Sequence, residues 1–172
     1  NITPEKGIGL NNSYENVIIF NICHNNREGI FIDNSSSRNL VVSNISYDNT
    51  SVGMNIKTSE YNLISSNIVY NNQNEGIRLD KLSYSLIMGN RIYGNGAEGI
   101  KVKNNSSDNL IFSNYGDLRI ENGDCKNNYL ATNIGSIQDN GGNTTYTQRE
   151  KITLEAEEYT DLENGGTISL TC

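Results

Sequence analysis

The stretch GIRLDKLSYSLIMGNRIYGN, residues 76–95, decides the fold, because its elements recur along the chain at a fixed spacing. Residues 29–49, GIFIDNSSSRNLVVSNISYDN, have the same order: a Gly-Ile pair, an aliphatic pair, and two asparagines five residues apart. Self-similarity at a period of about 20 to 50 residues is typical of repeat proteins. The sequence therefore reads as a series of repeating units.

Three kinds of position recur with a period of about 23 residues. Glycine followed by Ile or Met occurs at Gly7, Gly29, Gly53, Gly76 and Gly99. Asparagine occurs at Asn21, Asn44, Asn67, Asn90 and Asn114, and again at Asn26, Asn49, Asn72 and Asn95. An aliphatic pair starts at Val17, Leu40, Leu63, Leu86 and Leu110. Agreement among these columns predicts a solenoid of stacked coils.

Within each unit, apolar residues alternate as in a strand, for example at Ile30 and Ile32. Asn and Gly between these short strands tolerate the left-handed backbone that a sharp corner requires. Stacked coils place equivalent residues about 4.8 Å apart, so inward asparagines can hydrogen-bond along the stack. The leucine-rich repeat has a similar period, but it needs a helical segment that these units lack. We therefore predict a β-solenoid.

Residues 76–95 resemble the right-handed parallel β-helix repeat of the NosD-type family, in the carbohydrate-binding and sugar-hydrolase superfamily. They also resemble archaeal surface β-helix proteins such as the methanogen disaggregatases. The resemblance covers roughly residues 5–140 and implies an all-β, right-handed parallel β-helix of about five to six coils. It implies less about activity, because lyases, epimerases, hydrolases and non-catalytic surface proteins share this fold.

The predicted β-helix extends over residues 1–142, and residues 143–172 have a different pattern. After Asn114 we expect one shorter coil that uses Gly116, Leu118, Ile120 and Asn133. The C-terminal residues contain two strand-like segments joined by Gly-Gly. The sequence LEAEEY followed by NGG is similar to the start of sugar-binding β-sandwich modules. We interpret residues 143–172 as a cap or as the start of a further module.

Composition excludes several classes of function. A net charge of −7 argues against a nucleic-acid partner, which needs a basic surface. No apolar stretch reaches the roughly 18 to 20 residues of a membrane span. No signal peptide is visible, and the chain starts at Asn1 without an initiator Met, so we expect a processed piece of a longer protein. Eight Asn-x-Ser/Thr sequons fit an extracellular or cell-surface location.

Metal and cofactor chemistry is not predicted. NosD-type relatives are linked to copper, yet His24, Met54 and Met88 fall in different columns and make a poor soft-metal site. Calcium is possible, but the coils lack the Asp-x-Asp clusters of a calcium site and therefore offer no clear ligands. Cys23 occupies a core position, and Cys125 and Cys172 can pair if the C-terminus folds back.

Candidate functional residues lie in the columns expected to point outward when Ile30 and Ile32 point inward. These columns are Phe31, Asn55, Arg78 and Lys101; Asp33, Lys57, Asp80 and Lys103; Glu28, Val52, Glu75 and Glu98; His24, Tyr47, Tyr70 and Tyr93; and Ile22, Ile45, Ile68 and Arg91.

We predict the catalytic group to be Asp80, Arg78, Lys101, Glu75 and Glu98, with Lys103 as a substrate-binding residue. A lyase acting on uronates needs cations to neutralise the substrate carboxylate, and it also needs a base. A glycoside hydrolase needs two carboxyl groups instead, which one coil of separation places near the roughly 5 Å of retaining enzymes. The structural alternative is a ladder of opposite charges, which stabilises a sheet by about 0.2 to 1 kcal/mol per pair.

We predict that the tyrosine column, Tyr47, Tyr70 and Tyr93 with His24, binds sugar rings on its aromatic faces. The structural alternative is that stacked tyrosines stabilise the solenoid. Beside them, Ile22, Ile45 and Ile68 form an apolar strip that we expect a neighbouring domain, another subunit or the C-terminal strands to cover.

Together these features predict part of an extracellular polysaccharide-processing protein, of lyase or glycoside hydrolase type. The alternative is a non-catalytic cell-surface or adhesion module that binds glycan or acts as a spacer. The expected partner is a polysaccharide.

Overall fold

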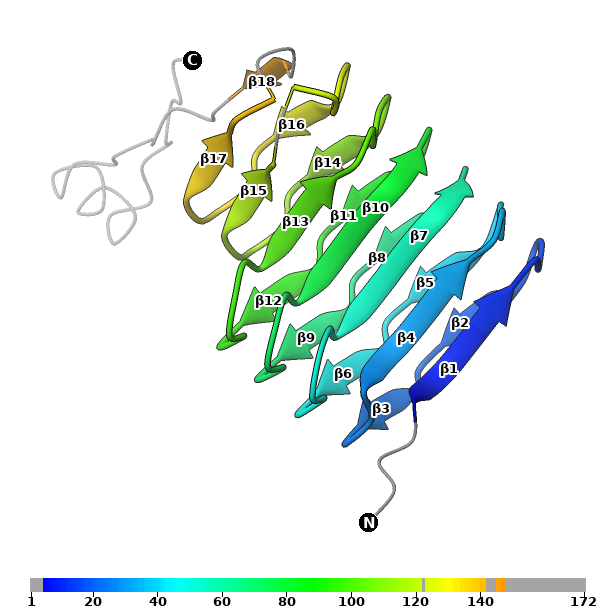
Figure 1. The fold of residues 1–172 in the computed structure, drawn as a ribbon. Coiled ribbons are helices and arrows are strands. Elements are labelled where there is room, and N and C mark those ends of the chain that lie inside the picture. The colour runs from blue at the N-terminus through cyan, green and yellow to red at the C-terminus, as the bar shows by residue number, and fades with distance from the viewer. Residues whose placement is uncertain (1–4, 122, 142–144, 148–172) are drawn as a thin grey trace, which may run out of the picture.

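A computed structural model describes residues 5–121, 123–141 and 145–147, the last three by their backbone. This part of the chain contains eighteen strands, which form three parallel sheets around one axis (Figure 1). We call them sheets A, B and C. Each complete coil contributes one strand to each sheet in turn. The predicted all-β fold, a right-handed parallel β-helix of about six coils, is confirmed.

Sheet A contains β1 (Lys6–Asn11), β4 (Glu28–Asp33), β7 (Met54–Glu60), β10 (Ile77–Ser83), β13 (Ile100–Lys103), β15 (Leu118–Ile120) and β17 (Ile137–Asp139). Sheet B contains β2 (Val17–Ile19), β5 (Leu40–Val42), β8 (Leu63–Ser65), β11 (Leu86–Met88), β14 (Leu110–Phe112), β16 (Tyr129–Ala131) and β18 (Thr145–Thr147). Sheet C contains β3 (Ile22–His24), β6 (Ile45–Tyr47), β9 (Ile68–Tyr70) and β12 (Arg91–Tyr93).

The register between coils follows the sequence period. In sheet A, Ile77 of β10 pairs with Met54 of β7 on one side and with Ile100 of β13 on the other. The coil after Asn114 is shorter, as predicted, because the Asn133 side chain accepts from the Asn114 side chain only 19 residues away. The columns of the sequence are therefore real columns of the structure.

The core is built from the inward residue of each short strand. Val41, Ile64 and Ile87 are completely buried at the centres of three neighbouring strands of sheet B. Ile30 and Ile32 are buried in sheet A, as the alternation predicts. Cys23 lies in this core, and Cys125 is a buried free thiol. Cys172 lies outside the described residues, so the proposed pairing with Cys125 stays a prediction.

The two predicted asparagine columns form ladders of side-chain hydrogen bonds. Asn67 shows the pattern: its Nδ2 donates to Asn90 Oδ1 at 2.9 Å and to the Val41 carbonyl at 2.9 Å. Its Oδ1 accepts from the Asn44 backbone N–H at 2.9 Å. Because each amide satisfies backbone groups at a buried corner, the ladder replaces the water that these groups would otherwise need.

A third ladder, at the corner between sheets A and B, was not predicted from the sequence. It consists of Asn16, Asn39, Asn62, Ser85, Asn109 and Asn128, linked by side-chain acceptors from one coil to the next. The same spacing of about 23 residues identifies it, but Ser85 interrupts the column. The Ser85 hydroxyl keeps the ladder continuous by accepting from the Asn62 N–H at 3.0 Å.

The last strand of the described residues is β18. Strand β18 pairs in parallel with β16 and so adds to sheet B. The rest of residues 143–172, and with it the predicted C-terminal strands, lies outside the described residues. No helix long and apolar enough to cross a membrane occurs in the described residues.

Candidate functional site

The outer face of sheet A brings the predicted catalytic residues together. Arg78 of β10 lies between Asn55 of β7 and Lys101 of β13, and Arg119 of β15 follows in the same column. Adjacent strands are about 4.8 Å apart, so these long side chains extend into one another's reach.

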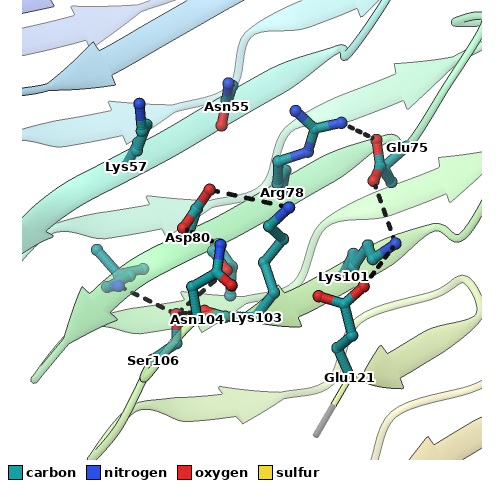
Figure 2. Close-up of polar contacts among 12 residues, drawn as sticks. Asn55, Lys57, Glu75, Arg78, Asp80, Lys101, Lys103, Asn104, Ser106 and Glu121 are labelled. Carbon is teal, nitrogen blue, oxygen red and sulfur yellow. Dashed lines mark hydrogen bonds and ion pairs between the residues drawn. The ribbon is translucent and has the colours of Figure 1, made fainter. Parts of the chain in front are cut away.

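Glu75, which precedes β10, is the centre of the charged cluster. Its Oε2 accepts from Arg78 Nη2 at 2.6 Å, and its Oε1 lies 3.7 Å from Lys101 Nζ (Figure 2). One carboxylate therefore holds two cations that come from neighbouring strands. The short distance to Arg78 indicates a charge-assisted hydrogen bond, the stronger class of such bonds.

Lys101 extends the cluster to the next coils. Its Nζ lies 3.9 Å from Glu98 Oε2 and 3.4 Å from Glu121 Oε1. Glu98 also accepts from Arg119 Nη1 at 2.9 Å. Arg119 and Glu121 were not predicted as site residues. The shortened coil shifts Arg119 to 18 residues after Lys101, so a search at a fixed period of 23 misses it.

The predicted outward column of Glu28, Val52, Glu75 and Glu98 is wrong in one respect. Glu28, Val52 and Glu75 are buried, with 3%, 0% and 5% of their surfaces exposed. Glu75 is covered by the two cations that it binds, and Glu28 accepts from Asn55 Nδ2 at 2.9 Å. Alternation along a strand predicts which face a side chain occupies, but not whether its neighbours cover it.

The cluster keeps its two central carboxylates ionised. Burial alone would raise the pKa of Glu75, but the hydrogen bond from Arg78 and the charges of Arg78 and Lys101 lower it overall. Burial would also raise the pKa of Glu98, but a hydrogen bond from its backbone N–H, the hydrogen bond from Arg119 and the charges of Lys101 and Arg119 lower it overall. Both groups therefore lack a proton at neutral pH, whereas a general acid must carry one.

We predict that Glu75→Gln destabilises the protein at neutral pH by about 1 to 3 kcal/mol, because it leaves Arg78 without its charge-assisted partner. The folded-state pKa of Glu75 lies below its ordinary value of 4.5, so its contribution is complete above that value and is lost as the pH falls through the folded pKa. Urea unfolding at about pH 7 and pH 3 measures both stabilities. The control is Glu5→Gln, at an exposed position. If Glu75→Gln lowers the free energy of unfolding by the same amount at both pH values, this role of Glu75 is refuted.

In the second charged column, aspartates and lysines of neighbouring coils form ion pairs. Lys57 Nζ lies 3.7 Å from Asp33 Oδ2, and Lys103 Nζ lies 4.0 Å from Asp80 Oδ2. Asp80 also accepts from Asn104 Nδ2 at 2.8 Å (Figure 2). These contacts agree with the charge ladder that the sequence offered as the structural alternative. Asp80 is buried by these contacts, and it lies two positions after Arg78 along β10.

A hollow of about 300 Å³ lies beyond Asp80, where β7 and β10 end. Its lining is hydroxyl-rich, with one acid and one base: Ser35, Thr58, Ser59, Glu60, Lys81 and Ser83. The hollow therefore continues the charged face along the strands rather than lying over Arg78 and Lys101.

The tyrosine column lies on sheet C, away from this face. His24, Tyr47, Tyr70 and Tyr93 stack in order, with ring centroids 5.0, 4.9 and 5.2 Å apart and planes within 13° of parallel. Both faces of Tyr47 and Tyr70 are therefore occupied by neighbouring rings. The predicted stacking of a sugar on these faces is not available to these two residues, which present their edges and hydroxyls.

Comparison with solved structures shows the fold. A variant of the periplasmic alginate epimerase AlgG is 20% identical, with a TM-score of 0.62, and covers 83% of this chain and 42% of its own. The A-module of the Azotobacter vinelandii mannuronan C-5 epimerase AlgE4 is 19% identical, with a TM-score of 0.62, and covers 84% and 50%. The AlgE6 A-module is 14% identical, with a TM-score of 0.63, and covers 83% and 53%. The chain thus spans about half the length of these epimerases.

Sequence comparison identifies the family. No curated protein matches the chain. The family model described as "Periplasmic copper-binding protein (NosD)" matches residues 1–164, which is nearly the whole sequence. The chain belongs to the NosD family.

Proposed function

We propose that this chain is the part of an exported polysaccharide-processing protein that binds an acidic polysaccharide on the outer face of sheet A. One observation carries the proposal. Arg78, Lys101, Lys103 and Arg119 gather on three adjacent strands of a chain whose net charge is −7. Cations that recur on adjacent strands favour an anionic ligand. Carboxylates on the same face, Glu75, Asp80, Glu98 and Glu121, pair with these cations.

The geometry suits a linear polymer of acidic sugars. Cations in one column recur every strand, at about 4.8 Å, which is close to the length of one sugar in an extended chain. A polymer that crosses the strands therefore presents one carboxylate to each coil. The hollow at the ends of β7 and β10, with its Ser and Thr hydroxyls, can take the uncharged part of the chain.

The reaction that fits these residues begins with removal of the proton at C5 of a uronate. Arg78 and Lys101 neutralise the substrate carboxylate and so make that proton more acidic. Asp80, on the same strand as Arg78, is the proposed base. The electron pair left at C5 then expels the 4-O substituent, whose oxygen takes up a proton from solvent, and this gives an unsaturated sugar and a new chain end. Alternatively, C5 takes a proton from solvent on the opposite face, which gives epimerisation, and in both cases Asp80 returns its proton to solvent.

Two further observations support this chemistry over hydrolysis. The lowered pKa of Glu75 and of Glu98 leaves neither carboxyl protonated to act as a general acid. The structural neighbours are alginate and mannuronan C-5 epimerases, whose chemistry changes the same carbon. We therefore assign Glu75 and Glu98 the role of holding Arg78, Lys101 and Arg119 in position.

A second candidate is a module that binds glycan, or spaces other domains, without turnover. It is favoured by the internal pairing of the cluster, since Glu75 and Glu98 already occupy the cations that a substrate would need. In that case the charged columns stabilise the coils, and the exposed hydroxyl edges of the tyrosine column are the other polar surface for sugars.

Copper does not fit the residues present, although the family description names it. His24, the single histidine of the chain, stacks on Tyr47, and its Nδ1 lies 2.8 Å from Asn25 Nδ2. Met54 is completely buried in sheet A, whereas Met88 belongs to sheet B. No group of three His, Cys, Asp or Glu side chains that could hold a metal is found in the described residues.

Binding to acidic and neutral polysaccharides tests the proposed surface. We expect the parent chain to bind a uronate polymer, and Arg78→Ala and Lys101→Ala each to weaken binding by at least about tenfold, which is roughly 1.4 kcal/mol. The matched control is Lys126→Ala, an exposed lysine away from this column. Equal binding by all these folded variants, or a preference for neutral polymers, would contradict the proposal.

A further inference from the structure

The outer face of sheet B is apolar along almost its whole length. Each strand has three residues, and the first and third point outward. The first positions are Val17, Leu40, Leu63, Leu86, Leu110 and Tyr129, and the third are Ile19, Val42, Ser65, Met88, Phe112 and Ala131. No charged residue belongs to either column.

The described residues leave this face open to solvent. Leu40 and Leu110 are 40% and 38% exposed, and Val17 and Ile19 at the first coil are exposed as well. The apolar strip continues around the corner through Ile22 and Ile68 of sheet C, which were predicted to need a cover. Soluble proteins rarely expose a continuous apolar surface of this size without using it.

We propose that a second copy of this chain covers sheet B, related by a two-fold axis that lies in the interface parallel to the strands and passes between β8 and β11. This axis reverses the order of coils but keeps each column opposite itself. The first coil then faces the sixth, the second faces the fifth, and the third faces the fourth. The pairing is isologous, as in most homodimers.

In the third-position column, two of the three pairs that this axis creates match a large residue with a small one, and the third pair is Val42 with Phe112. Ile19 faces Ala131 of the second copy, so a large residue meets a small one. Ser65 faces Met88 in the same way on either side of the axis. In the first-position column, Leu40 faces Leu110 and Leu63 faces Leu86. The remaining pair is Val17 with Tyr129. Side chains of alternating size allow two flat sheets to interdigitate at the roughly 10 Å spacing of packed sheets.

The residues along one edge of the sheet B face, which we call the rim, also match across this axis, in this case by charge. Its column consists of Glu15, Arg38, Tyr61, Tyr84, Asp108 and Asn127, all with left-handed backbone angles at one corner of the coils. In the second coil Arg38 is exposed, and the axis places it opposite Asp108 of the fifth coil. Tyr61 lies opposite Tyr84. A two-fold axis along the solenoid would instead place Arg38 opposite the other corner, which holds Phe20, Ser43 and Ser66.

Three columns of different chemistry thus agree on one symmetry. They supply about 18 residues per copy, near the lower end of the roughly 20 to 30 residues of a standard interface. We therefore expect a dimer with a dissociation constant in the micromolar range. The absence of charge in the outward columns of β2, β5, β8, β11, β14 and β16 lets two copies meet there although each has a net charge of −7.

Sedimentation equilibrium over a range of protein concentrations tests the dimer. We expect Leu40→Lys alone and Leu110→Glu alone to raise the dissociation constant by at least about tenfold, since each buries an unpaired charge. Positions 40 and 110 lie three strands apart in one copy, too far to pair, but opposite each other across the axis. Mixing the two variants, or combining them in one chain, is therefore expected to restore the dimer.

Circular dichroism of each variant checks that the substitution at these partly exposed sites leaves the protein folded. A monomer at every concentration overturns the proposal, as does a dimer that the two single substitutions leave unchanged. A dimer that both single variants break and the mixture fails to restore overturns this symmetry. If the protein is a monomer, an amine-specific cross-link between position 40 of the Leu40→Lys variant and Lys151 would assign the face to the C-terminal residues instead. None of these outcomes depends on polysaccharide binding, because sheets A and B are separate surfaces.

Discussion

Replacing Asn67 with alanine is expected to destabilise the β-helix by about 3 to 5 kcal/mol, which is a large share of the stability of a domain. The side chain is completely buried and lies in the middle of a ladder. Its removal leaves the Val41 carbonyl and the Asn44 N–H without the partners described above. Each unsatisfied buried group costs about 1 to 3 kcal/mol. Urea unfolding followed by circular dichroism measures the loss.

Asn21→Ala at the start of the same ladder is the matched control. Asn21 is half-buried, and it donates to Asn44 Oδ1 from both its N–H and its Nδ2. Alanine at position 21 loses the Nδ2 donation but keeps the backbone N–H, so Asn44 Oδ1 still accepts a hydrogen bond. We expect this change to cost about 1 kcal/mol. Equal losses at positions 21 and 67 would show that the ladder does not act as a chain of buried hydrogen bonds.

Replacing Gly76 with alanine is expected to cost about 3 kcal/mol or more, through overpacking rather than through backbone strain. A Cβ at this position would lie 2.3 Å from Ile92 Cγ2 and 2.8 Å from the carbonyl oxygen of Gly99. Ile92 is buried in the core and Gly99 belongs to the next coil, so neither can move away from a new Cβ without disrupting the core or separating neighbouring coils. A thermal melt measures the effect, which we expect to be a fall in Tm of several degrees.

Gly9→Ala provides the comparison within sheet A. A Cβ on Gly9 meets only the Lys6 Cδ at 3.5 Å, which is an ordinary contact with a mobile side chain. We expect this change to leave Tm within about a degree of the parent. If both glycine variants melt alike, the close approach of coils at the Gly76 corner is not what limits stability.

The sequence predicts the fold well because equivalent residues of successive coils in a solenoid recur at a fixed spacing along the chain. Glycine at positions equivalent to Gly76 and asparagine at positions equivalent to Asn67 recur in successive coils, because each coil needs the same close approach and the same corner hydrogen bonds. The third ladder was missed where Ser85 replaces asparagine, since one hydroxyl can substitute for an amide without changing the backbone. A fixed period also fails at the shortened coil that contains Arg119.

The site was predicted less completely, for reasons that lie in side-chain contacts. The columns correctly placed Arg78 beside Lys101, but they could not show that both cations bind one buried Glu75. Equally, the spacing predicted a row of tyrosines but not that the rings would cover each other's faces. The apolar face of sheet B was not predicted, because an aliphatic pair such as Leu40-Val41 does not indicate which member the strand turns outward.

The most direct test of the proposed function is a time course of the chain with uronate polymers and neutral polysaccharides in deuterated water. It follows unsaturated uronate, new reducing ends and deuterium at C5 together. We predict that a uronate polymer gains unsaturation or C5 deuterium, and that Asp80→Asn abolishes the change while the protein stays folded. Reducing ends without either signal, or binding without any turnover, would contradict the proposed chemistry, and the latter would favour the non-catalytic module.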